Sequence, residues 1–382
     1  MVATVVAYQL FQLTKSSFSI GIVGLSEFVP VFTLALYAGH VIDRSDKRTL
    51  LLKSMLSYAL CVAALLFVTS HWVIEKVTAN TTALLFYIII FFSGIVRAFV
   101  GPGGSAIIAQ LVPKDVLRFA ASLSSTSWLA ASILGHASAG FLIAGVGVHK
   151  TFFVIFGLVI IAAFLLSRID RKPAAQTDLT VKAWDSVKQG IRFVFSHRVM
   201  LGAISLDLFA VLFGGATALI PEIADRILNV GPVGFGWLNA AMDIGSGIMI
   251  FSITLVPIAR RQGYKLFYAV GGFGLCIIVF GLSRNYFLSF AVLMIAGMLD
   301  GISVVIRSTV MQLTTPDEMR GRVSSVNSMF VNSSNELGQF ESGFTAKLFG
   351  GAAPAVIFGG SMTLLVVILT WLKAPALRKF EY

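Results

Sequence analysis

Long apolar stretches, separated by short polar turns, recur from one end of the chain to the other. Each stretch is long enough to cross about 30 Å of hydrocarbon as an α-helix. The eleven stretches lie at residues 20–42, 50–70, 84–108, 119–145, 149–168, 199–221, 234–257, 266–283, 286–310, 323–346 and 354–373. This pattern predicts an all-α integral membrane protein with eleven complete membrane-spanning helices.

A further apolar segment, residues 1–13, precedes the first of these stretches. As a helix it would be roughly 20 Å long, too short to cross a bilayer. It carries neither the basic head nor the small-residue cleavage site of a secretory signal peptide. We interpret it as the last half of a twelfth helix, which implies that the start codon is misassigned or that the chain is truncated.

The composition agrees with a membrane protein: 57% of the 382 residues are hydrophobic, 12% are charged and the mean hydropathy is +0.88. The net charge of +11 raises the question of a nucleic-acid partner. If the turn near residue 45 faces the cytoplasm, however, most of the 29 Lys and Arg residues fall in cytoplasmic loops and helix ends. This positive-inside pattern predicts a cytoplasmic C-terminus and no nucleic-acid partner.

The longest polar segment, residues 167–198, divides the chain near its middle. Apolar residues at helical spacing in its second half predict an amphipathic helix on the membrane surface. We therefore expect an N-terminal six-helix lobe at 1–166 with an incomplete first helix, a cytoplasmic linker at 167–198 and a C-terminal six-helix lobe at 199–382.

The two halves also share a sequence repeat. QLVPKDVLRFAASLSS at 110–125 aligns with QLTTPDEMRGRVSSVNS at 312–328, at an offset of 202 to 203 residues. An offset that carries six spans gives two copies with the same orientation in the membrane. Such a parallel repeat is typical of two-lobed transporters.

The turn after the first complete span reads GHVIDRSDKR, residues 39–48. It resembles the signature between helices two and three of the major facilitator superfamily. RAFVGPGG at 97–104 and GHASAG at 135–140 resemble, less closely, the signatures of the fourth and fifth helices. The resemblance implies a two-lobed bundle of 12 helices with a 6+6 repeat, a transporter rather than an enzyme, acting as a monomer without a cofactor or metal.

Two further segments narrow the resemblance. YQLFQLTKSSFSIGIVGLSEFVPVF near the N-terminus and TTPDEMRGRVSSVNS at 314–328 are similar to the branch that contains the enterobactin exporter and the macrolide efflux proteins. Membership of that branch implies export as the direction of transport, across a bacterial inner membrane.

The turn itself is expected to act as a conformational latch for the outward-facing state. Its residues in register with the signature are Gly39, Asp43, Arg44, Lys47 and Arg48. Glycine permits close helix packing, the carboxylate can accept hydrogen bonds from a helix N-terminus or pair with a base, and the three bases keep the turn cytoplasmic. Asp46 replaces a glycine of the signature and adds a second carboxylate.

Charged side chains within the spans are costly unless they are paired, hydrated or functional. Candidates to line the cavity or couple protons are Arg97, Asp300, Asp207, His136, Asp243 and Glu336. Glu27 and Glu341 lie near predicted helix ends, where they either reach the headgroups or serve function. Arg307 is expected to extend toward the cytoplasmic headgroups.

Arg97 and Asp300 stand out because the 203-residue offset places them at equivalent depths in helices four and ten. The family resemblance implies that these helices line the central cavity, together with helix seven and its Asp207. The pair is therefore expected to be a proton-coupling site or a plain salt bridge between the lobes. His136 is expected to be a packed, hydrogen-bonded side chain or a proton carrier. Helix packing is the expected role of Gly101, Gly103, Gly135 and Gly140.

Together these features predict a secondary active transporter, proton-coupled, that exports a siderophore or an amphipathic drug-like molecule by alternating access. Its partners would be the small-molecule substrate, protons and the lipid bilayer. The alternatives are a proton symporter that imports a polar metabolite, and a non-transporting membrane sensor or enzyme. A sensor would normally carry a soluble output domain, and no nucleotide-binding loop or metal cluster marks an enzyme.

Overall fold

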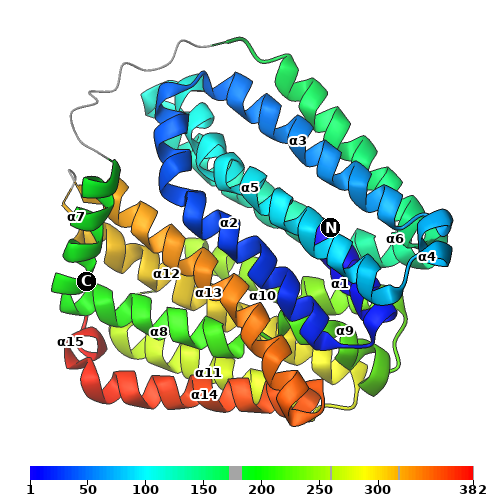
Figure 1. The fold of residues 1–382 in the computed structure, drawn as a ribbon. Helices are drawn as coiled ribbons and strands as arrows, with labels where there is room; N and C mark the ends of the chain where they lie inside the picture. Colours follow the sequence, from blue (N-terminus) through cyan, green and yellow to red (C-terminus); the bar gives the residue numbers. More distant parts are fainter. Residues whose placement is uncertain (172–182, 259, 317–318, 382) are drawn as a thin grey trace.

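The computed structural model describes residues 1–171, 183–258, 260–316 and 319–381 and contains no strand within them (Figure 1). The long helices are α1 (Val2–Thr14), α2 (Ser17–Arg44), α3 (Lys47–Val68), α5 (Ala79–Leu111), α6 (Leu117–Ser167), α8 (Arg198–Gly214), α10 (Pro232–Leu255), α11 (Gln262–Leu282), α12 (Tyr286–Thr314), α13 (Arg320–Phe349) and α14 (Ala352–Lys373). Shorter elements are α4 (His71–Lys76), η1 (Lys114–Val116), α7 (Ala183–Ser196), η2 (Ala216–Leu219), α9 (Ile220–Glu222), η3 (Ile223–Ile227) and α15 (Pro375–Arg378).

The helices correspond to the apolar stretches of the sequence. Within the described residues, nine segments are long and apolar enough to cross a membrane. One of them, α6, contains two predicted spans that join at Gly147, where a φ of 81° interrupts the helix. Two predicted segments fall outside the nine: α13, whose membrane-spanning part carries Glu336 and Glu341, and α1, which is a 13-residue apolar helix. The predicted all-α bundle is confirmed.

Two seams join the N-terminal helices α1–α6 to the C-terminal helices α8–α14. In one, α2 packs against α13, and in the other α6 packs against α10. Glycines bring the backbones together at both. A Cβ on Gly343 of α13 would lie 2.9 Å from the Cα of Gly21 in α2, and a Cβ on Gly140 of α6 would lie 3.0 Å from the Cα of Gly236 in α10.

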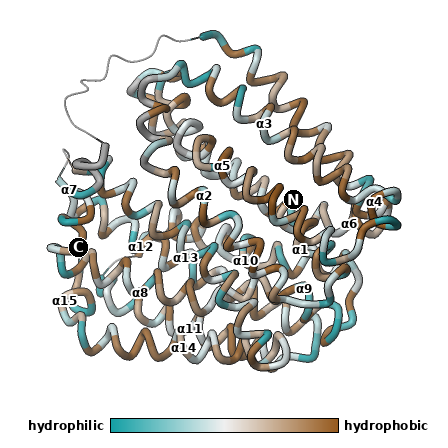
Figure 2. The backbone as a smooth tube through the Cα atoms, in the orientation of Figure 1, coloured by the Kyte–Doolittle hydropathy of each residue, from teal (hydrophilic) through white to brown (hydrophobic). Residues whose placement is uncertain are grey.

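Within each lobe, the remaining long helices pack on one another. In the N-terminal lobe, α3 packs on α5 and α6, and in the C-terminal lobe α11 packs on α12 and α14. Figure 2 shows hydrophobic residues along the lengths of the helices and hydrophilic residues gathered toward the helix ends. This is the distribution that a bilayer requires.

The bundle has two distinct ends. We call the end with the α2–α3 turn, the start of α11 and the C-terminus the hairpin end, and the end with the α1–α2 turn the Lys15 end. The lobes meet at the Lys15 end and diverge toward the hairpin end (Figure 1). Residues 121–128, in the part of α6 near the hairpin end, are all exposed. At the hairpin end α7 lies against both α13 and α2.

The division of the chain at 166 and 199 stays a prediction, because residues 172–182 of the linker lie outside the described residues.

Candidate functional site

A charged cluster crosses the α2–α13 seam. The Arg97 guanidinium, on α5, forms ion pairs with the carboxylates of Glu27 on α2 and of Glu336 on α13. The Arg97 Nη1 to Glu336 Oε1 distance is 3.4 Å. One cation therefore links acids that belong to opposite lobes. We call Glu27, Arg97 and Glu336 the arginine cluster.

The arginine cluster is exposed on one side only. The Arg97 side chain is 53% exposed, whereas the side chains of Glu27 and Glu336 are 14% and 10% exposed. The second carboxylate oxygen of Glu336, Oε2, is buried and has no hydrogen-bond partner among the described residues. With both acids ionised the cluster carries one excess negative charge, so a bound proton would neutralise it.

A second polar cluster crosses the α6–α10 seam. Asp243 on α10 accepts a hydrogen bond from Ser132 Oγ at 2.6 Å, and its Oδ2 lies 3.7 Å from Nε2 of His136, both on α6. The other ring nitrogen of His136, Nδ1, lies 2.7 Å from the hydroxyl of Thr4 on α1. We call Ser132, His136 and Asp243 the histidine cluster. Both seams thus have a polar connection between the lobes.

The predicted pairing of Arg97 with Asp300 is wrong: among the described residues, Arg97 pairs only with Glu27 and Glu336. Asp300 instead lines a small cavity with Asp207. A two-fold repeat places equivalent residues on opposite sides of its axis, so equal depth does not bring them into contact. Carboxylates on the adjacent helices α2 and α13 are nearer to Arg97.

The expectation for Arg307 is also corrected. Arg307 does not extend to the headgroups but forms an ion pair with Asp207, with 2.5 Å between Nη1 and Oδ2, and its side chain is 13% exposed. Its Nε also donates to Ser303 Oγ at 3.2 Å. For Glu27 both the headgroups and a functional role were expected alternatives, and it pairs with Arg97 within the protein. In both cases a residue on another helix supplies the opposite charge.

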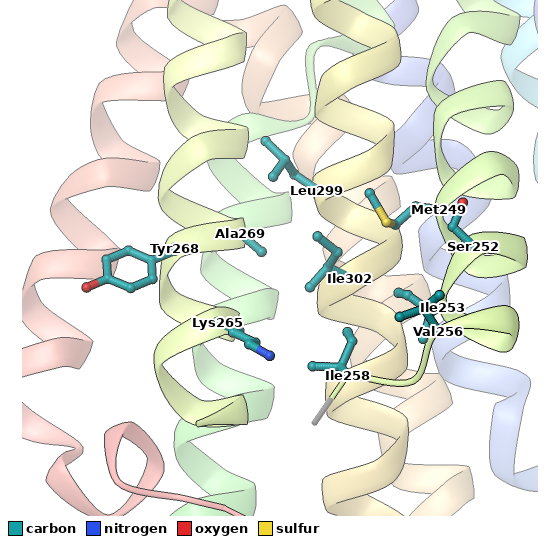
Figure 3. A pocket seen from close by; sticks show the side chains of 10 residues that line it. All are labelled: Met249, Ser252, Ile253, Val256, Ile258, Lys265, Tyr268, Ala269, Leu299 and Ile302. Carbon is teal, nitrogen blue, oxygen red and sulfur yellow. The ribbon is translucent and has the colours of Figure 1, made fainter. Parts of the chain in front are cut away.

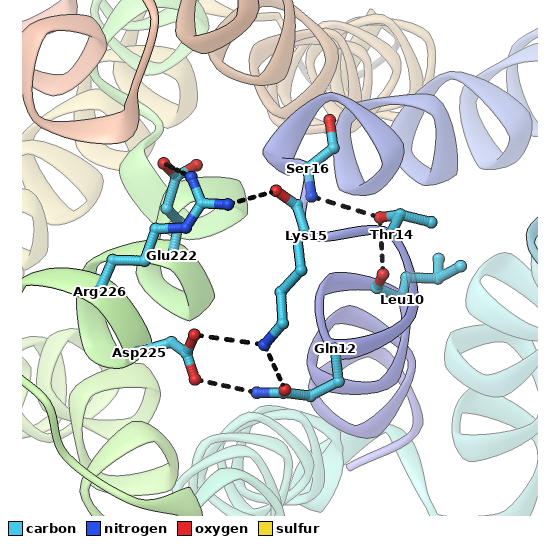
Figure 4. Close-up of polar contacts among 8 residues, drawn as sticks. All are labelled: Leu10, Gln12, Thr14, Lys15, Ser16, Glu222, Asp225 and Arg226. Carbon is cyan, nitrogen blue, oxygen red and sulfur yellow. Dashed lines mark hydrogen bonds and ion pairs between the residues drawn. The ribbon is translucent and has the colours of Figure 1, made fainter. Parts of the chain in front are cut away.

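At the Lys15 end, charged residues of α9 and η3 hold the α1–α2 turn (Figure 4). Asp225 forms an ion pair with Lys15 Nζ at 3.4 Å and accepts a hydrogen bond from Gln12 Nε2 at 3.1 Å. Arg226 donates to the Lys15 carbonyl oxygen at 2.8 Å, and Ser17 Oγ donates to Glu222 at 2.5 Å. These contacts close this end between the lobes. Sequence reasoning missed them, because nothing in the spacing of such residues indicates which charges meet across more than 200 positions.

The α2–α3 turn is organised by Asp46, whose side chain caps α3. It accepts hydrogen bonds from the Arg48 backbone N–H at 3.2 Å and from Thr49 Oγ1 at 2.5 Å. The hydrogen bond from Thr49 is the main reason that the pKa of Asp46 is lowered. An Asp directly before a helix is the sequence signal that could have shown this role.

The predicted latch is described only in part. Arg48 donates to the carbonyl oxygen of Ser167 at the end of α6, and Lys47 Nζ donates to the Ile42 carbonyl oxygen at 3.4 Å. Gly39, Asp43 and Arg44 lie outside the residues whose side chains the structure describes. The latch role of the turn therefore stays a prediction.

The four glycines expected at helix contacts divide into two groups. A Cβ on Gly140 would lie 2.5 Å from the Pro232 carbonyl oxygen, and one on Gly103 would lie 3.0 Å from Leu51 Cδ2. A Cβ on Gly135 would lie 3.3 Å from the Met1 nitrogen. At Gly101 a Cβ would meet nothing within 4 Å, so the packing role predicted for Gly101 is wrong in this arrangement of the lobes.

The fold and the clusters on its seams define a polytopic membrane transporter built from two lobes. The Major Facilitator Superfamily model matches residues 1–339. The chain belongs to that superfamily, whose members are transporters and not enzymes.

Similar proteins support the same class. The chain is 25% identical over 394 residues to the multidrug efflux pump Tap of Mycolicibacterium fortuitum, covering 99% of this chain and 93% of Tap. It is 22% identical over 394 residues to the enterobactin exporter EntS of Shigella boydii, covering 100% of this chain and 89% of EntS. Among solved structures, a D-xylose-proton symporter superposes with a TM-score of 0.79 at 13% identity, over 100% of this chain and 95% of the symporter, which shows the fold alone.

Proposed function

We propose that this protein is a proton-driven exporter of a siderophore or an amphipathic drug-like small molecule, and that the arginine cluster couples proton binding to the movement of the lobes. The observation that carries this proposal is the position of Arg97 between acids of opposite lobes. A lobe-to-lobe link of this kind must rearrange when the two lobes rock about the seams.

The direction of transport follows from two considerations. The nearly full-length relatives Tap and EntS are named as an efflux pump and an exporter. We place the basic hairpin end in the cytoplasm of a bacterial inner membrane, and on that proposal the closed Lys15 end makes this state inward-facing. An exporter loads its substrate in this state.

The proposed cycle uses the excess negative charge of the arginine cluster. A proton on Glu336 or Glu27 weakens the attraction of that acid for Arg97, and proton release toward the cytoplasm restores it. Substrate that enters between the lobes meets the exposed side of the cluster, and a donor group of the substrate that hydrogen-bonds to the Glu27 or Glu336 carboxylate takes the place of the proton there. The inward-facing state would therefore exchange a proton for a substrate molecule.

Transport into everted membrane vesicles that contain the overexpressed protein tests this proposal. An outward-directed proton gradient, with the vesicle lumen acidic, should drive accumulation of an amphipathic dye or a catecholate siderophore into the vesicles, and Glu336→Gln should abolish accumulation but retain exchange driven by substrate alone. Asp300→Asn is the matched control because Asp300 does not pair with Arg97. Accumulation of these substrates with the proton flux, rather than against it, would establish symport and refute export by antiport.

A further inference from the structure

A groove opens on the side of the C-terminal lobe, away from both seams. It has a volume of about 460 Å³ and is lined by residues of α10, α11 and α12 and of the connection between α10 and α11 (Figure 3). Leu299 and Ile302 of α12 form its floor, because α12 packs against both α10 and α11. The arginine and histidine clusters contribute no residue to it.

The walls of the groove face the bilayer. Val256 at the end of α10 is 76% exposed and Tyr268 on α11 is 69% exposed. The side of α10 that meets the other lobe is a different one, marked by Gly236 and Asp243. In a membrane an apolar groove on this side is in contact with lipid chains.

The end of the groove near the hairpin end is basic. Lys265 lines it, and its nitrogen points into the groove in Figure 3. Arg260 and Arg261, both exposed, lie in the connection that forms the adjacent rim. Residues 256–265 contain no Asp or Glu, whereas the corresponding turn of the N-terminal lobe contains Asp43 and Asp46.

The backbone at this rim is strained. Arg260 and Arg261 have φ angles of 57° and 55°, in the left-handed region that residues other than glycine rarely adopt. Two such residues in succession set the path of the chain into α11. Strain of this kind is common where the backbone positions side chains for a ligand.

We propose that the groove is a specific site for an anionic phospholipid, with an acyl chain along Leu299 and Ile302 and the phosphate headgroup at Arg260, Arg261 and Lys265. Charge complementarity selects this occupant: three bases at the headgroup level attract an anionic lipid over a zwitterionic one, and the apolar groove below them accepts the chain. The site is independent of the transport proposal, because it uses none of the residues assigned to proton coupling.

Lipid titration of the purified protein tests the site. The probes are phosphatidylglycerol and phosphatidylcholine added to protein in detergent, with retained lipid counted by native mass spectrometry. Wild type should retain phosphatidylglycerol in preference to phosphatidylcholine. The triple variant R260Q/R261Q/K265Q should bind phosphatidylglycerol more weakly, on the order of a hundredfold, because each of the three bases contributes separately to the attraction of an anionic lipid.

Two further variants separate the site from a general loss of fold or charge. Ser252→Trp fills the groove from an exposed position and should also displace phosphatidylglycerol while thermal unfolding in detergent stays unchanged. Lys53→Gln removes an exposed base of the N-terminal lobe and should leave binding as in wild type. Equal retention of both lipids, unchanged binding in the triple variant and in Ser252→Trp, or competition by inorganic phosphate alone would each overturn the proposal.

Discussion

The α2–α13 seam is connected by a permanent cation between two carboxylates, whereas the α6–α10 seam is connected by a histidine and a serine around one carboxylate. Both seams have glycine contacts, and Gly140 and Gly343 are separated by the same 203 residues that relate the two halves. The backbone of the two seams is thus repeated, but the chemistry is not.

The difference assigns the seams different roles. The arginine cluster holds more negative than positive charge, so a change of protonation alters how strongly it joins the lobes. The histidine cluster contains no permanent cation and is held by hydrogen bonds that join Ser132 to Asp243 and Thr4 to His136. We infer that the α2–α13 seam responds to protons and that the α6–α10 seam is mainly a hinge contact.

After Glu336→Gln, the largest expected effect is that of Arg97→Gln. It leaves two acids facing each other across the α2–α13 seam without their cation. Gradient-driven export should therefore fall by about tenfold or more, because a loss of ~1.4 kcal/mol in the lobe contact corresponds to a factor of ten. Transport in everted vesicles measures it. The double variant R97Q/E336Q should regain thermal stability but not gradient-driven export, and full recovery of export would show that the cluster is only a salt bridge.

Glycine substitutions test the similarity of the seams. A Cβ on Gly140 would lie 2.5 Å from the Pro232 carbonyl oxygen and one on Gly343 would lie 2.8 Å from that of Ser17. Because backbone atoms cannot move aside locally, Gly140→Val and Gly343→Val should each lower export severalfold. Gly101→Val is the matched control, since a Cβ there meets nothing within 4 Å. A loss at only one seam would contradict the equivalence of the two contacts.

Asp243→Asn tests the inferred difference between the clusters. Asparagine keeps a carbonyl oxygen that can accept the hydrogen bond of Ser132, and only the charge of the acceptor is lost, so export should fall by less than about threefold. The pH dependence of export should stay that of wild type. A shifted pH profile in this variant, measured in everted vesicles, would place proton coupling at the histidine cluster instead.

The smallest expected effect concerns Asp46, which caps α3 at the hairpin end. Asp46→Ala should lower the free energy of unfolding by about 1 kcal/mol or less near neutral pH. The lowered pKa of Asp46 means that its stabilising contribution is present above the unfolded value of about 3.9 and is lost as the pH falls through the lower folded value. Thermal unfolding of wild type and variant should therefore converge at acidic pH. A constant difference would exclude the carboxylate as the source.

The sequence alone determined the class, the spans and the repeat of this protein. A bilayer leaves few alternatives to a helix of about 20 apolar residues, so periodicity and length identify each span without reference to the others. The turn at residues 39–48 identified the family for a similar reason, because its residues are contiguous.

Only the tertiary structure decided which charges meet. The acids that pair with Arg97 come from α2 and α13, and the sequence does not show which helices adjoin across the seams. The lipid groove and the contacts that close the Lys15 end depend in the same way on the packing of distant helices. Ion pairing acts over a few ångströms, whereas sequence patterns report the environment of one helix at a time, so the partners of a buried charge are fixed by packing rather than by spacing.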